Sequence, residues 1–209
     1  ESGTLRPEDV PGNAVANTYT LNDWYGDGVV VEGAGFLLNN EMDDFSTKPG
    51  VPNLYGVVGG SANAIAPGKR MLSSMSPTIA LQDGHVALVA GTPGGTTIFT
   101  SVFQTMLNIY DFHMTPGEAV AAGRFHHQLL PPDQIIYSVC CALPDDTIEG
   151  LRALGYKPQQ SPWEFGDMQV IAVDAAGTVT AGSDPRGRGV PIVEAIMPAA
   201  PALKHAQAR

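Results

Sequence analysis

Positive charge is scarce in this sequence. Only 11 of the 209 residues are Lys or Arg, against 21 Asp and Glu, so the formal net charge is −10. A surplus of negative charge of this size repels nucleic-acid phosphates and anionic membrane surfaces, and we expect no nucleic-acid partner. Long apolar runs are missing too. No stretch approaches the roughly 20 residues of a membrane-spanning helix, so we expect no membrane insertion by this chain.

Cysteine is almost absent. Cys140 and Cys141 are the only two, and they are neighbours. One peptide unit holds their Cα atoms closer together than disulfide geometry prefers, so we interpret both as free thiols that fill space. No spacing of Cys and His is typical of a metal site. We therefore expect no metal and no cofactor.

Apolar material, by contrast, is sufficient for one continuous core. Hydrophobic residues make up 44% of the chain and charged residues 15%, which is typical of a folded domain. Composition divides the chain into a polar head over 1–12, a domain over 13–190, and an Ala- and Pro-rich tail over 191–209. The sequence does not begin with Met and shows no signal peptide, so we expect a processed piece of a longer chain.

Local patterns predict strands, then helices, then strands again, which indicates an α+β fold with antiparallel sheets packed on helices. Asp83-Gly84 is a typical hairpin turn between two strands over 76–91. The other expected elements are a strand over 13–22, a strand pair with glycine kinks over 28–40, a long loop over 43–70, helices over 96–112, 115–122 and 144–154, and a hairpin over 168–186. The second helix begins with a capping box at Thr115 and Glu118.

Two short stretches have residue types that suit recognition of negative charge. Gly94 and Gly95 lie between a strand and a helix, where free backbone N–H groups suit an oxyanion hole. An ordinary turn explains the glycine pair equally simply. Ser73 and Ser74 precede a strand, and paired hydroxyls can bind a carboxylate, although serines also form local turns.

Other stretches have groups that suit an ammonium ion or proton transfer. Glu41, Asp43 and Asp44 form a cluster that could receive a substrate ammonium group, or could be a solvated strand end. Thr20 and Asn22 are two residues apart, so a strand would place both side chains on one face. The adjacent histidines 126 and 127 are interpreted as structural, because neighbours point in different directions.

The order and spacing of six stretches are more specific than any one of them. "NAVANTYTLN", "GFLLNNEMDDFSTKPGVPNLYG", "NAIAPGKRMLSSMSPTIA", "GTPGGTTIFTSV", "RFHHQLLPPD" and "SDPRGRG" together closely resemble the small, catalytic subunit of γ-glutamyltranspeptidases over roughly 12–189. The resemblance implies an αββα N-terminal-nucleophile hydrolase sandwich, of which this chain is the small-subunit part. It also implies a precursor that cuts itself and exposes a threonine nucleophile, whose own α-amino group can act as the base.

The resemblance implies a role for each matching residue. Thr20 matches the threonine that hydrogen-bonds the nucleophile, and Gly94 and Gly95 match the oxyanion-hole turn. The remaining matches bind the donor: Asn22, Glu41 and Asp44 hold its α-amino group, Ser73 and Ser74 hold its α-carboxylate, and Tyr55 belongs to a lid over the glutamyl pocket.

The head departs from the family pattern. Counting back from Gly12 places Ser2 where the nucleophilic threonine belongs, and Glu1 precedes it. The stretch "GTLRPE" stands where the family has a β-strand, and Pro7 suits a strand interior poorly. Ser2 is the nucleophile candidate, but only if Glu1 is removed, and a head with no working nucleophile is the alternative.

The function implied is γ-glutamyl transfer or hydrolysis, from glutathione and related γ-glutamyl amides to water, an amino acid or a peptide, through a covalent acyl-enzyme. We expect a large subunit from the same precursor as the partner and a periplasmic or extracellular location. Two alternatives stay open: a relative that binds or assembles without catalysis, and an acylase of glutaryl or cephalosporin type.

Overall fold

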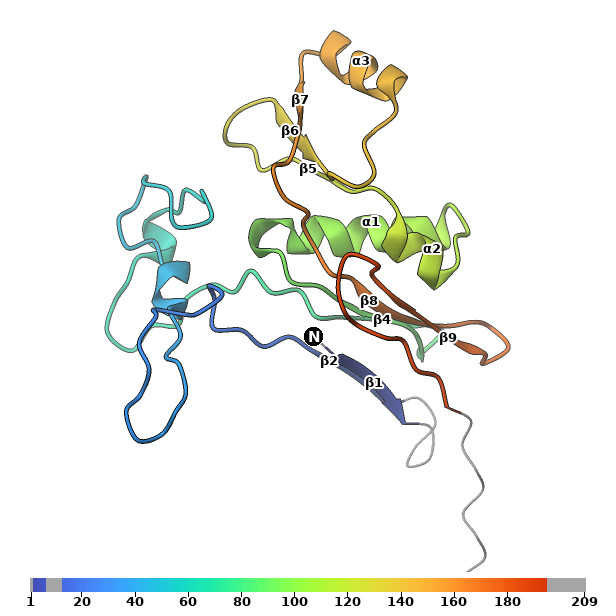
Figure 1. The fold of residues 1–209 in the computed structure, drawn as a ribbon, viewed down its shortest axis with the longest axis horizontal. Helices are drawn as coiled ribbons and strands as arrows, with labels where there is room; N and C mark the ends of the chain where they lie inside the picture. Colours follow the sequence, from blue (N-terminus) through green and yellow to red (C-terminus); the bar gives the residue numbers. More distant parts are fainter. Residues whose placement is uncertain (1, 7–12, 195–209) are drawn as a thin grey trace, which may run out of the picture.

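The computed structural model describes residues 2–6 and 13–194, with side chains from residue 13 onward. Its centre is a four-stranded antiparallel sheet in the order β3-β4-β8-β9 (Figure 1). The strands are β3 (Thr78–Gln82), β4 (His85–Gly91), β8 (Gln169–Val173) and β9 (Val179–Ser183). Both predicted hairpins are confirmed. Asp83 and Gly84 have positive φ values of 52° and 82°, which suits a tight two-residue hairpin turn.

Two helices cover one face of this sheet (Figure 1). They are α1 (Ile98–Tyr110) and α2 (Pro116–Ala121), and the predicted capping box at Thr115 opens α2. The core lies between sheet and helices and comprises Leu88, Ala90, Val102, Val120, Met168 and Val170. Residues 87–90 of β4 are all buried, although successive side chains point to opposite faces. Both faces of β4 are therefore covered.

The second cover is a two-stranded antiparallel ribbon that lies against β4. It consists of β1 (Ser2–Arg6) and β2 (Asn13–Asn17). The expectation that the head lacks the family's strand was wrong, because Ser2–Arg6 pairs residue by residue with Asn13–Asn17 and Pro7 follows the strand's end. The layers are thus helices, sheet and the beginning of a second sheet. This arrangement fits the predicted α+β class and the small-subunit part of an αββα sandwich.

A smaller unit packs above the helices in Figure 1. It holds β5 (Phe125–His126), β6 (Gln134–Tyr137), β7 (Lys157–Gln160) and the predicted helix α3 (Asp145–Ala153). β5 and β6 pair antiparallel, whereas β6 and β7 pair parallel. Sequence patterns did not predict these strands.

A long region of loops, at the left of Figure 1, joins β2 to β3. It contains only the short 3₁₀ helices η1 (Glu41–Asp44) and η2 (Ser61–Asn63). The long loop over 43–70 was predicted, but the strand pair over 28–40 was wrong, because a single bridge joins Val30 and Leu37 there. Val30 stays 59% exposed, so no packed face holds the two segments as strands. The tail has no helix or strand over 191–194, and residues 195–209 lie outside the described residues.

Candidate active site

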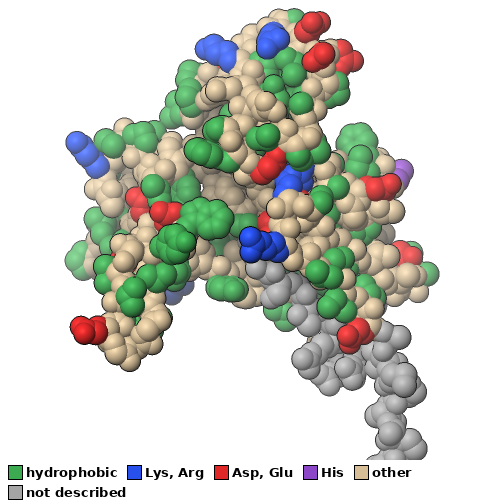
Figure 2. All heavy atoms as spheres, viewed as in Figure 1, with side chains coloured by type: hydrophobic (Ala, Val, Ile, Leu, Met, Phe, Trp, Pro, Cys, Tyr) green, Lys and Arg blue, Asp and Glu red, His purple; other side chains and the backbone are tan. Residues whose placement is uncertain are grey.

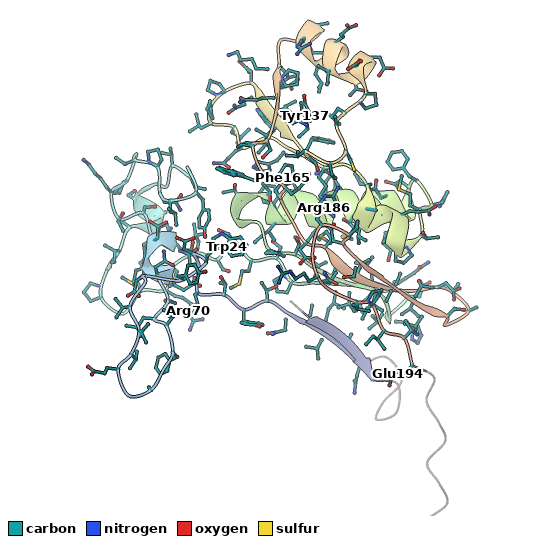
Figure 3. The ribbon with its side chains drawn as sticks, viewed as in Figure 1. Trp24, Arg70, Tyr137, Phe165, Arg186 and Glu194 are labelled. Atoms are coloured by element: carbon teal, nitrogen blue, oxygen red, sulfur yellow. The ribbon has the colours of Figure 1, made fainter. Side chains whose placement is uncertain are left out.

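One open cavity gathers most of the residues singled out in the sequence. Its volume is about 840 Å³, and it lies where the end of β2, the loop region and the turn after β4 meet. Of the predicted site residues, the following line it: Thr20, Asn22, Glu41, Asp44, Tyr55, Ser74, Gly94 and Gly95. Trp24 also lines the cavity and lies between the loop region and the start of α1 (Figure 3). Segments far apart in sequence therefore share one concave surface.

The glycine turn has a backbone that other residues adopt poorly. Gly94 has φ 140° and Gly95 has φ 54°. Gly94 precedes η3 (Gly95–Thr97), and α1 follows directly. The Thr97 amide and hydroxyl both donate to the Gly94 carbonyl, at 3.0 and 2.9 Å. Within the described part of the chain, neither glycine N–H donates to a protein acceptor. The turn thus presents two free donors at the beginning of a helix, where partial positive charge favours an anion.

The acidic residues lie together on η1, beside the cavity. Burial raises the pKa of Glu41, and the negative charge of Asp44 raises it further. Burial likewise raises the pKa of Asp44, with Asp43 adding to the effect. None of the three forms a salt bridge with a described residue. An ammonium ion in the cavity would therefore offset the cost of burying these carboxylates and reduce their mutual repulsion.

Thr20 and Asn22 face the cavity from a turn, and the predicted strand geometry was wrong. β2 ends at Asn17, and Asn22 has φ 74°. The Asn22 amide N–H donates to Thr20 Oγ1 at 2.8 Å, which closes a local turn. The Asn22 side-chain Nδ2 donates to the Asn40 carbonyl at 3.1 Å and ties this turn to the residue before η1.

Tyr55 lies in the loop over 49–60 and closes over the glycine turn. Its hydroxyl donates to the Asn22 carbonyl at 2.6 Å. Its ring is so near Gly95 that a Cβ there would lie 2.9 Å from Tyr55 Cδ1. Burial raises the pKa of Tyr55, and the nearby carboxylates of Asp23 and Asp44 add to this. The phenol therefore stays protonated and remains a hydrogen-bond donor.

The two serines are placed differently. Ser74 lines the cavity, whereas Ser73 is exposed and its Oγ accepts a hydrogen bond from the Met75 amide at 3.2 Å. Ser73 therefore has the geometry of a local turn in this structure. The backbone of Ser2 pairs with Asn17, which lines the cavity, so the strand register brings the start of β1 to the site. The Ser2 side chain is outside the described residues.

A buried ion pair that was not predicted joins Arg124, directly before β5, to Asp184, directly after β9. Arg124 and Asp184 are each 2% exposed, and Arg124 Nη2 lies 2.5 Å from Asp184 Oδ2. Arg186 Nη1 approaches Asp184 Oδ1 at 2.9 Å and lies beside the two helices, below Phe165 (Figure 3). Burial raises the pKa of Asp184, but the Arg186 amide and the Arg124 guanidinium outweigh it, so the net pKa is lowered. These residues belong to the stretches "RFHHQLLPPD" and "SDPRGRG", whose local patterns did not predict an ion pair between them.

The layered sheet with a cavity at its edge is the fold of the small-subunit part of an N-terminal-nucleophile hydrolase. A γ-glutamyltranspeptidase from Pseudomonas nitroreducens superposes with a TM-score of 0.86 at 56% identity, covering 92% of this chain and 98% of that chain. The model of the gamma-glutamyltranspeptidase family matches residues 8–194. The chain belongs to the γ-glutamyltranspeptidase family.

Curated relatives agree with this assignment. A glutathione hydrolase proenzyme of Pseudomonas aeruginosa is 62% identical over 185 residues, which is 88% of this chain and 33% of that protein. One from Escherichia coli is 49% identical over 178 residues, or 85% of this chain and 30% of that protein. The chain thus spans about a third of the length of these relatives. Among the described residues, no helix is both long and apolar enough to cross a membrane.

Proposed function

We propose that this chain, together with the rest of its proenzyme, transfers γ-glutamyl groups from glutathione and related amides to water, an amino acid or a peptide. The observation that carries the proposal is one cavity lined by the Gly94-Gly95 turn and by Glu41 and Asp44, two carboxyl groups without a salt bridge to any described residue. The cavity thus offers counterparts for an ammonium group and for a developing oxyanion. Ser74, on the same surface, offers a hydroxyl for the donor carboxylate.

The proposed chemistry begins with a hydroxyl at the head of the chain. With Glu1 removed, the Ser2 hydroxyl attacks the γ-carbonyl carbon, and its proton passes to the new α-amino group. The Gly94 and Gly95 amides stabilise the negative oxygen of the tetrahedral intermediate. The amine of the donor leaves with a proton, and an acyl-enzyme remains. Water or an acceptor amine then attacks the same carbonyl and restores the hydroxyl. In this scheme Thr20 is the hydrogen-bond partner of the nucleophile.

A large subunit made from the same precursor is the proposed partner, and self-cleavage of that precursor is the proposed origin of the chain. The relatives are named proenzymes and are about three times as long, which supports both. Apolar side chains are also uncovered at the sheet edge. Ile79 and Leu81 on β3 are 43% and 62% exposed, and Val15 on the ribbon is 56% exposed. Figure 2 shows apolar side chains spread over the face that it presents. The proposed location, periplasmic or extracellular, rests on the family resemblance.

Release of the chromophore from a γ-glutamyl anilide tests the proposal. The chain is assayed together with its large subunit and alone. We expect turnover in the complex, and Asp44→Asn should raise KM for the anilide strongly. A complex whose chain begins at Ser2 but that releases no chromophore would refute the proposed activity.

Two alternatives give different results. A relative without a working nucleophile would bind glutamate in a calorimeter but would leave the anilide intact. An acylase would cleave a glutaryl anilide, which lacks the α-amino group, at least as well as the γ-glutamyl anilide. The carboxyl pair at Glu41 and Asp44 favours the γ-glutamyl donor, because a glutaryl group brings no positive charge to that pair.

A further inference from the structure

Tyr55, in the loop over 49–60 that forms the lid, is held from two sides. Two of its contacts are with the site itself: the hydroxyl with the Asn22 carbonyl, and the ring with Gly95. A third contact comes from elsewhere. Gln128 Nε2 donates to the Tyr55 backbone carbonyl at 3.3 Å, across 73 positions of sequence. Gln128 follows β5 and lies in the smaller unit above the helices.

A second cavity, of about 250 Å³, lies at this contact. Tyr55 and Gly56 from the lid line it, together with residues from the smaller unit: His126, Gln128, Leu130, Pro131, Gln134 and Ile136. A Cβ at Gly56 would lie 3.6 Å from Gln128 Nε2, so the lid backbone passes directly beside this amide. The lid therefore rests on the smaller unit through few atoms, and only Gln128 donates a side-chain hydrogen bond to Tyr55 in the described part of the chain.

His126 fixes the other end of this contact. It is 2% exposed, and its Nδ1 lies 3.0 Å from the hydroxyl of Thr100, in the first turn of α1. Its Nε2 has no hydrogen-bond partner among the described residues. Burial lowers the pKa of His126. Gln128 lines the same cavity as this ring, so it links the smaller unit, anchored on α1 through His126, to the carbonyl of the lid.

We propose that Gln128 is a positioning residue that holds Tyr55, and with it the lid, closed over the donor pocket. The proposal rests on the proposed function, in which the donor binds under this lid. Losing the hydrogen bond would shift the lid toward the open form by about 3- to 10-fold, as expected for one neutral hydrogen bond. Because the donor would then bind a less populated closed form, its KM should rise, by at most the same factor. The turnover number should stay within about twofold, since the glycine turn is untouched.

The test compares two substitutions. Gln128→Glu keeps the shape of the side chain but removes its N–H group, and Gln128→Met removes the N–H group without adding charge. Gln134→Glu is the matched control, because Gln134 lines the same cavity but donates to Gln159 at 2.7 Å and not to the lid. With the complete protein and a γ-glutamyl anilide, both Gln128 variants should raise KM, by up to about 10-fold, and the control should not. An unchanged KM in both Gln128 variants would overturn the proposal.

A second measurement does not depend on turnover. Chymotrypsin cleavage after Leu54 or Tyr55 requires local opening of the lid. Both Gln128 variants should speed this cleavage about 3- to 10-fold with an unchanged Tm, whereas Gln134→Glu should not. If the native protein releases no chromophore, the proposed function fails, yet the cleavage rates still decide the role of Gln128. Equal cleavage rates in all four proteins would refute that role.

Discussion

The glycine turn supplies the sharpest single substitution, Gly95→Ala. Gly95 has φ 54°, and an alanine held in this left-handed region costs about 1–2 kcal/mol. The new Cβ would also lie 2.9 Å from Tyr55 Cδ1, so either the turn or the lid has to move. We expect the free energy of unfolding to fall by about 1–3 kcal/mol. If the turn moves, an oxyanion donor is misplaced, and kcat should fall by about 10² to 10³.

The control for this variant is Gly150→Ala. Gly150 lies inside α3, and a Cβ there would meet nothing within 4 Å. Alanine favours a helix over glycine by about 0.5–1 kcal/mol, so this variant should be slightly more stable and fully active. The assays are urea unfolding and anilide turnover of the complete protein. A Gly95→Ala protein whose kcat and KM both lie within about threefold of the native values would refute the assignment of the turn as an oxyanion hole.

Three further substitutions test the acid cluster, the buried ion pair and a helix cap. The pKa of Asp44 is raised by folding, so its contribution to stability falls as the pH rises above about 4. Asp44→Asn should remove this loss in pH-dependent thermal melts while weakening donor binding, and an unchanged KM would contradict the role. The pKa of Asp184 is lowered, so its stabilisation is present above about pH 4 and is lost as the pH falls further. Asp184→Asn should cost about 3–5 kcal/mol in urea unfolding at neutral pH, because it strands the buried Arg124 charge, and a cost below 1 kcal/mol would argue against the pair. Thr115→Ala, which breaks the capping box of α2, should cost about 1 kcal/mol with unchanged turnover, and an unchanged unfolding midpoint would count against the cap.

Local sequence patterns predicted those elements whose stability is local. The hairpin at Asp83-Gly84 and the capping box at Thr115 follow from the conformations of a few neighbouring residues, and the structure has both. β7 could not be predicted in this way. Its sequence, Lys-Pro-Gln-Gln, has little strand preference, and it forms only because β6 lies parallel beside it.

Exposed apolar residues explain why two predicted strands are missing from the structure. The two apolar runs over 28–40, separated by glycines, predicted a strand pair, but Val30 and Leu37 form only one bridge. Val30, Phe36 and Leu38 are 59%, 55% and 40% exposed, so these runs have little described surface to pack on. We expect such residues to be covered by the proposed large subunit.

In the candidate site, too, the sequence predicted some features and missed others. Motif order identified residues that the fold then brought to one cavity, among them Glu41, Ser74 and Gly95. It could not find Gln128, whose contact with Tyr55 spans 73 positions. It also placed Ser73 beside Ser74, although the structure turns Ser73 outward into a local hydrogen bond. Side-chain direction in irregular loops depends on packing that spacing does not contain.

Mass spectrometry of the chain after brief incubation of the complete protein with a γ-glutamyl donor and acid quenching tests the central claim most directly. We expect a chain that begins at Ser2 and carries one glutamyl group, which peptide mapping places on Ser2. A preparation that turns over the donor while its chain retains Glu1 and carries no glutamyl group would contradict the account.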